Sequence, residues 1–352
     1  MQMKTRLRIR TPGRAAQSGL SIVELMVALA LGLLVVAGVA TLIARQSNSR
    51  NELDKSHQLV DNGRFALTTL VDDLQHAGYY GFYALPMTAL TALPDPCATT
   101  AVAIDASLPM PLQGYDAPAT VPAPLSACLA DADHVPGTDI LVIRRLEAVE
   151  APGAIATLAA GQVYVQATAV SKVTAVGPDP APAAPTVYTL TMKDGTTPAP
   201  VRKYVERIYF VSPCDVYAAG ATTCTAAADN GQPIPTLKRL ELSVASGVPT
   251  FTTVPIAEGI ENLQLDYVVD AAGDGTPSAT PVTAPAVADW PNVMTVQAYV
   301  LARNLQQSGG YDGSTRAFRL GQMAAVGPFA DTYKRHVFSS NARLLDVSGR
   351  RE

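Results

Sequence analysis

An uninterrupted apolar segment near the N-terminus constrains this chain more than any other feature. After Glu24, twenty residues from Leu25 to Ala44 carry no charge. At a rise of about 1.5 Å per residue, such a segment forms a helix about 30 Å long, which matches the hydrocarbon thickness of a bilayer. The sequence therefore predicts a transmembrane helix over residues 20–44.

The residues before this segment set its orientation. Residues 1–19 hold five basic side chains and no acid: Lys4, Arg6, Arg8, Arg10 and Arg14. Because positively charged flanks stay on the cytoplasmic side of a membrane, we expect the N-terminus in the cytoplasm and everything after Arg45 on the far side.

The small residue Gly19 lies before the apolar core and not after it. A secretory signal is cut after its core, whereas Gly19 precedes it. Cleavage between Gly19 and Leu20 would leave the core attached and make Glu24 the fifth residue of the mature chain. An unpaired acid at the edge of an apolar segment costs a few kcal/mol, so Glu24 needs a partner. On hydropathy alone, a plain signal anchor with an interfacial Glu24 also fits.

The run Gly19-Leu20-Ser21-Ile22-Val23-Glu24-Leu25 resembles the prepilin processing motif. Five further blocks resemble the PilW family of type IV pilus assembly proteins, which are minor pilins: NGRFALTTLVDDLQHAGYYG, GTDILVIRR, IAEGIENLQLDYVVD, WPNVMTVQAYVLARN and YKRHVFSSNARL. The resemblance implies a pilin-like fold, cleavage by prepilin peptidase after Gly19, and methylation of Leu20. It also implies a salt bridge between Glu24 and the Leu20 amine of a neighbouring subunit.

The resemblance further implies where the protein acts and with what. We expect a single-pass inner-membrane precursor with its head in the periplasm, which then enters the pilus filament or its tip. The implied partners are other minor pilins, the major pilin, prepilin peptidase and a tip adhesin. A minor pseudopilin of type II secretion is an alternative, because it shares the leader, the helix and the α+β head. Two alternatives come from other classes of protein: a membrane-anchored calcium-dependent adhesin or binding module, and an anchored hydrolase.

Apolar residues continue at helical spacing beyond the membrane segment. A seven-residue repeat with flanking apolar positions forms a stripe, comprising Leu53, Val60, Phe65, Leu67, Leu70, Val71 and Leu74. No proline occurs between Leu20 and Tyr83, so one helix about 80 Å long is predicted from Ser21 to His76, with Gly78 as its stop. The predicted organisation is a leader at 1–19, a long helix at 20–77 and a head at 78–352.

The rest of the chain shows strand patterns. Nine prolines between residues 85 and 137 preclude long regular elements, so we expect an irregular loop there. Apolar runs or alternation predict strands at 140–143, 162–176, 187–192, 205–211, 239–244, 263–269, 293–301 and 336–344. A long helix followed by a mostly antiparallel sheet indicates the α+β class.

All four cysteines, Cys97, Cys128, Cys214 and Cys224, follow the membrane segment. If the host is a Gram-negative bacterium, this position is the oxidising periplasm, and two disulfides are expected. Three pairings are possible. The short spacing between Cys214 and Cys224 favours local pairing, which leaves Cys97 with Cys128.

No recognisable catalytic motif occurs, and we expect no enzymatic activity and no cofactor. The four histidines, His57, His76, His134 and His336, are scattered without metal-binding spacing. The run from Asp270 to Gly275 resembles the start of a calcium loop, but Ala272 stands where an oxygen ligand is expected. Asp270 and Asp274 are the calcium candidates, although a polar turn is the favoured interpretation because Asp and Gly are also turn residues.

The charge of the chain bears on its bulk partners. The formal net charge is −4 and becomes −9 once the five basic leader residues are removed. This acidity disfavours nucleic acid or anionic lipid as a partner.

Overall fold

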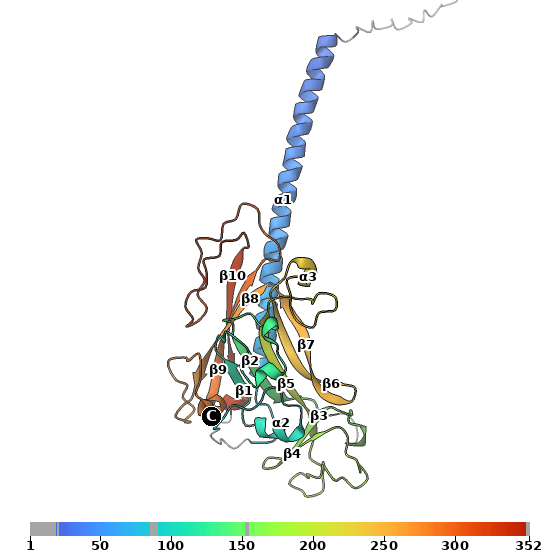
Figure 1. Ribbon diagram of the computed structural model, residues 1–352, viewed down its shortest axis with the longest axis vertical. Coiled ribbons are helices and arrows are strands. Elements are labelled where there is room, and N and C mark those ends of the chain that lie inside the picture. Colours follow the sequence, from blue (N-terminus) through green and yellow to red (C-terminus); the bar gives the residue numbers. More distant parts are fainter. Residues whose placement is uncertain (1–18, 20, 85–90, 152–154, 350–352) are drawn as a thin grey trace, which may run out of the picture. The chain divides into compact units, whose positions relative to one another are not determined.

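The computed structural model describes residues 19, 21–84, 91–151 and 155–349. The leader residues 1–18 and Leu20 lie outside the described residues. The chain divides into two compact units, Met1–Asp54 and Lys55–Glu352, and helix α1 (Ile22–Gln75) contributes to both (Figure 1). The predicted long N-terminal helix is confirmed.

The sequence around α1 explains where the helix begins and ends. The Ser21 carbonyl accepts the Leu25 N–H at 3.0 Å, and the Ser21 hydroxyl accepts the Val23 N–H at 3.3 Å, which satisfies amides of the first turn. At the other end Gly78 has a φ of +78°, a conformation that glycine adopts without strain. Its N–H donates to the Arg144 carbonyl at 3.0 Å, so the chain leaves the helix directly onto the sheet.

The larger sheet of the head has seven strands, all paired antiparallel. The strands are β1 (Leu112–Tyr115), β2 (Ile140–Leu146), β3 (Val163–Ala167), β4 (Lys172–Val176), β5 (Val201–Ser212), β6 (Thr236–Ala245) and β7 (Val248–Glu258). The long strand β5 organises the sheet because it pairs with three others, β2, β3 and β6. Strand β2 is buried on both faces, as its continuous apolar run predicts.

The smaller sheet has the order β10-β9-β8, formed by β8 (Ile260–Val269), β9 (Val293–Arg303) and β10 (Arg335–Arg343). The head half of α1 lies against both sheets (Figure 1). One core joins the three: Leu67 and Leu70 of the helix are packed in it with Leu141 of the larger sheet and Val300 of the smaller. The predicted α+β architecture with an antiparallel head is confirmed.

Two strand expectations were wrong. Residues 162–176 form not one strand but the hairpin of β3 and β4, because the Thr168 side chain accepts the Ser171 N–H at 3.0 Å and closes a turn. Residues 187–192 form no strand beyond an isolated bridge between Thr191 and Pro198. Side chains take the amides that a strand would pair: Asp179 accepts the Val187 N–H at 2.8 Å, and Gln166 accepts the Leu190 N–H at 2.9 Å.

Several other elements were not predicted from the sequence. Residues 85–137, expected to be irregular, contain helix α2 (Ala101–Ser107), strand β1 and two 3-10 turns, all short enough to fit between prolines. Thr100 starts α2 by accepting the Ala103 N–H. Strand β7 was missed because it carries Pro249 and Pro255, which are tolerated on a strand with one neighbour. Two further short segments are α3 (Ala228–Gly231), in which Asp229 and Asn230 have positive φ, and α4 (Leu345–Gly349).

Candidate functional site

The first turn of α1 holds the acid that the sequence analysis singled out. Glu24 lies in this turn and is exposed, as is Gly19. A carboxylate there is favoured by the positive end of the helix dipole. Leu20, the other residue of the expected cleavage site, lies outside the described residues.

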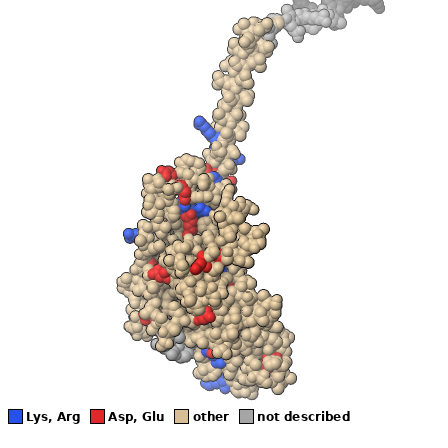
Figure 2. Space-filling model, in the orientation of Figure 1, with Lys and Arg blue, Asp and Glu red and all other residues tan. Residues whose placement is uncertain are grey.

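The helix following Glu24 has the dimensions of a membrane span. The apolar part of α1 is long enough to cross a bilayer, and none of it is buried within the protein. In Figure 2 the corresponding stretch of helix is free of charged side chains. Among the described residues this is the one helix long and apolar enough to cross a membrane, and it indicates membrane anchoring.

A buried carboxylate fastens the other end of α1 to the head. The Asp73 side chain is 2% exposed and accepts hydrogen bonds from Arg207, from the Tyr209 hydroxyl and, at 3.2 Å, from Arg239. Arg145 approaches the same carboxylate at 3.6 Å. Because these partners lie on β2, β5 and β6, the cluster fixes the helix on the larger sheet. Asp73 was not predicted from the sequence, although it follows Leu70 by three residues on the buried face of the helix.

A second buried ion pair links three strands. Arg144 Nε lies 2.8 Å from Glu206 Oε1, with both side chains fully buried. The Tyr204 hydroxyl donates to Glu206 at 3.0 Å, and Arg144 donates to Gln113 at 3.1 Å. Burial raises the pKa of Glu206, while the charge of Arg144 opposes that rise. This pair has no solvent access and holds the strands together.

The Asp270 loop has the geometry of a capped turn. Asp270 is fully buried, and its two carboxylate oxygens accept the N–H groups of Gly273 at 2.8 Å and Gly275 at 3.0 Å. Asp274 accepts the Thr276 N–H at 2.8 Å. Within the described residues, no group of three or more His, Cys, Asp or Glu side chains is arranged to hold a metal ion. The loop amides therefore use the oxygens that the calcium interpretation would assign to an ion.

The four cysteines form two disulfides in the structure, Cys97 with Cys128 and Cys214 with Cys224. This is the pairing that the short Cys214–Cys224 spacing favours. The first disulfide ties the segment before α2 to the turn at 125–127, and the second closes a ten-residue loop between β5 and β6.

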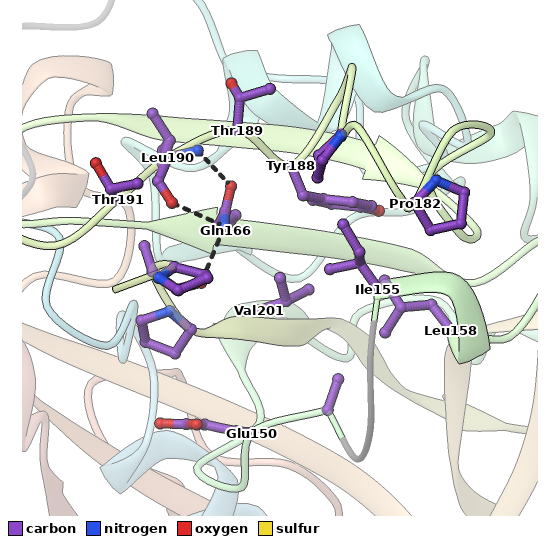
Figure 3. Close-up of a pocket in the computed structure, with 15 residues that line it drawn as sticks. Glu150, Ile155, Leu158, Gln166, Pro182, Tyr188, Thr189, Leu190, Thr191 and Val201 are labelled. Atoms are coloured by element: carbon purple, nitrogen blue, oxygen red, sulfur yellow. Dashed lines mark hydrogen bonds between the residues drawn. The ribbon is translucent and has the colours of Figure 1, made fainter. Parts of the chain in front are cut away.

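A cavity of about 600 Å³ lies between β3, the start of β5 and residues 182–191 (Figure 3). Its walls are mostly apolar, with Ile155, Leu158, Tyr188 and Val201 among them. The Gln166 side-chain amide joins two wall segments, because it donates to the Leu190 and Ala199 carbonyls at 3.2 and 2.9 Å (Figure 3). The lining residues do not bring an acid, a base and a nucleophile together.

The match to a known protein family lies in the C-terminal part of the head. Residues 222–345 match the PilW family, Type IV Pilus-assembly protein W. No curated protein matches the chain. Among solved structures, the type IV-like pilin TTHA1219 from Thermus thermophilus aligns with 82% of this chain and 97% of its own, at 11% identity and a TM-score of 0.32. The match to the PilW family thus spans strands β6 to β10 of the head, in a chain whose long apolar N-terminal helix precedes antiparallel sheets.

Proposed function

We propose that this protein is a minor pilin, a structural subunit that prepilin peptidase cuts between Gly19 and Leu20 and that then enters a type IV pilus. The PilW match over β6 to β10 carries the proposal. The position of Glu24 in the first turn of an apolar helix supports it. In this role the protein starts in the inner membrane with its head in the periplasm, and its partners are the major pilin and other minor pilins.

The proposed mechanism couples processing to assembly through charge. Before cleavage the nitrogen of Leu20 is an uncharged amide, whereas cleavage turns it into a cationic amine near an apolar helix. An acid and an amine about 4 Å apart attract by about 4 kcal/mol at an effective dielectric constant near 20, and desolvation offsets part of this. We propose that Glu24 of one subunit pairs with the Leu20 amine of its neighbour, so that only processed subunits assemble well.

Intact-mass analysis of the membrane-extracted protein tests the processing step. The expected mass corresponds to a chain that starts at Leu20 and carries one methyl group. Gly19→Val should leave the full precursor, whereas Ser18→Val, its neighbour in the leader, serves as the matched control and should be processed. A mature mass that retains the basic leader would contradict the proposed cleavage.

Complementation of a deletion strain tests the role of Glu24. Glu24→Val removes the acid without adding polarity to the helix, so we expect normal membrane insertion but fewer surface pili and less of this subunit in sheared filaments. Glu24→Asp retains the charge and should restore much of the loss. Wild-type piliation by Glu24→Val at matched protein levels would refute the pairing.

A further inference from the structure

Strand β10 is one edge of the smaller sheet, since β9 is its one partner among the described strands. The Asn304 N–H donates to the Lys334 carbonyl at 3.0 Å, and the Leu344 N–H donates to the Met294 carbonyl at 2.9 Å. These two bonds lie just beyond the two ends of the β9–β10 ladder, and both join residues that oppose each other in its register. Bonded and non-bonded pairs alternate along an antiparallel ladder. The even-numbered residues of β10 therefore point their backbone N–H and carbonyl groups toward β9.

The odd-numbered residues of β10 consequently point their backbone groups away from the sheet. Val337, Ser339 and Asn341 each present an N–H and a carbonyl on this side. In the described part of the chain, no hydrogen bond reaches any of these six groups. Such a row is a template for pairing with another strand.

Other long edges of the head are protected. Strand β7 carries Pro249 and Pro255, which remove donors from its edge. The outer side of β8 is partly bonded, because the Asp139 N–H donates to the Leu263 carbonyl at 2.9 Å and the Asp139 carboxylate accepts the Leu265 N–H at 2.7 Å. Strand β10 is nine residues long and without proline, and the described residues give it no comparable protection.

A groove of about 510 Å³ runs beside this edge. Leu67 and Val71 of α1 and Phe338 of β10 give it an apolar floor. Arg64 and Asp72, both exposed, line the helix side two turns apart, which is about 12 Å along the axis. The described residues include no ion pair to either charge.

The direction of α1 relative to β10 sets the order in which a bound strand meets these charges. Ser56 and Val60 line a cavity with His336, whereas Gly63 packs on Phe338. Helix and strand therefore run in the same direction. A segment antiparallel to β10 would pass Asp72 first and Arg64 last, and at about 3.4 Å per residue the two charges lie about four strand residues apart.

We propose that the β10 edge binds an extended segment of another protein as an added antiparallel strand. The recognised segment has a basic residue for Asp72, an apolar residue two positions later for the floor, and an acidic residue two positions after that for Arg64. This goes beyond the proposed function because it specifies the chemistry of a partner. A second copy of this chain fits poorly, since antiparallel pairing of two β10 strands about Ser339 places Arg335 opposite Arg343 at both ends.

Fluorescence anisotropy with the full-length protein in detergent micelles tests the recognition. The probe is the labelled peptide Thr-Lys-Thr-Val-Thr-Glu-Thr, and its control has the same composition with Lys and Glu exchanged. We expect the control to bind about fivefold more weakly, since two ion pairs become two repulsions. The double variant Arg64→Glu with Asp72→Lys should reverse this preference. Equal affinity for both peptides, or no binding of either, would overturn the proposal.

A second comparison tests the backbone pairing. Ser339→Pro removes an outward N–H but leaves the β9 ladder intact, so we expect about tenfold weaker binding, with Ser339→Thr as the unaffected control. A backbone N-methylated probe peptide makes the same test on unaltered protein and should lose binding. Retained affinity of the methylated peptide would exclude strand addition. A wild-type dimer in sedimentation that Ser339→Pro abolishes would place a second copy on this edge and would likewise overturn the choice of partner.

Discussion

Asp139 is a carboxylic acid, 1% exposed, that connects segments distant in the sequence. It accepts the Ala117 N–H at 2.8 Å and the Leu265 N–H at 2.7 Å. Burial raises its pKa to about 7, although both amides favour the charged form and act in the opposite direction. The folded protein therefore holds this proton more tightly than the unfolded chain, in which the pKa stays near 3.8.

This difference predicts a pH-dependent stability. The contribution of Asp139 is fully present below pH 4 and is lost as the pH rises through 7, because the unfolded chain releases the proton first. The loss amounts to about 4 kcal/mol across that window. Urea unfolding of wild type and Asp139→Asn between pH 4 and pH 8 measures it: the variant should show a flatter dependence. The exposed Asp61→Asn is the control, and an unchanged slope for Asp139→Asn would contradict the prediction.

At the scale of elements, the fit between α1 and β10 depends on one glycine. A Cβ on Gly63 would overlap the ring of Phe338. Alanine favours a helix interior by about 1 kcal/mol over glycine, but overpacking costs about 1–3 kcal/mol. Glycine at this position therefore stabilises the helix–sheet contact rather than the helix.

A double-mutant cycle separates these two effects. We expect Gly63→Ala to lower the free energy of unfolding by about 1 kcal/mol in the wild type, because the contact term exceeds the propensity term. In the Phe338→Ala background the same change should raise it by about 1 kcal/mol, since only propensity remains. Chemical denaturation of the four proteins provides the measurement. Stabilisation by Gly63→Ala in both backgrounds would show that the ring moves aside without cost.

At the scale of the whole molecule, the two disulfides restrain different lengths of chain. The Cys97–Cys128 bond spans 31 residues and the Cys214–Cys224 bond spans ten. Loop-closure entropy predicts that removing the longer link costs about 4 kcal/mol and removing the shorter about 3 kcal/mol. Paired Cys→Ser variants, compared by thermal unfolding, should follow this order. If removing the Cys214–Cys224 bond lowers the stability more than removing the Cys97–Cys128 bond, native packing dominates over chain entropy.

The sequence was most informative where the signal is local. The helix bounds, the strands β2, β5, β6, β8, β9 and β10, and the apolar span follow from periodicity and from the absence of proline. The interpretation failed at 162–176 and 187–192, where the side chains of Thr168, Asp179 and Gln166 bond the backbone. It also passed over Asp73 and Asp139, because burial of an acid depends on partners far away in the chain.

The sequence by itself determined the α+β class, the membrane-compatible helix, and the resemblance that names Gly19, Leu20 and Glu24. Charge, hydropathy and repeat spacing are properties of neighbouring residues, so they can be read from the sequence before the fold is known. Only the tertiary structure decided which strands are neighbours, that three arginines converge on Asp73, and that β10 remains an edge beside a charged groove. Pairing and burial join residues that are distant in the chain, and local patterns report which face is buried but not what covers it.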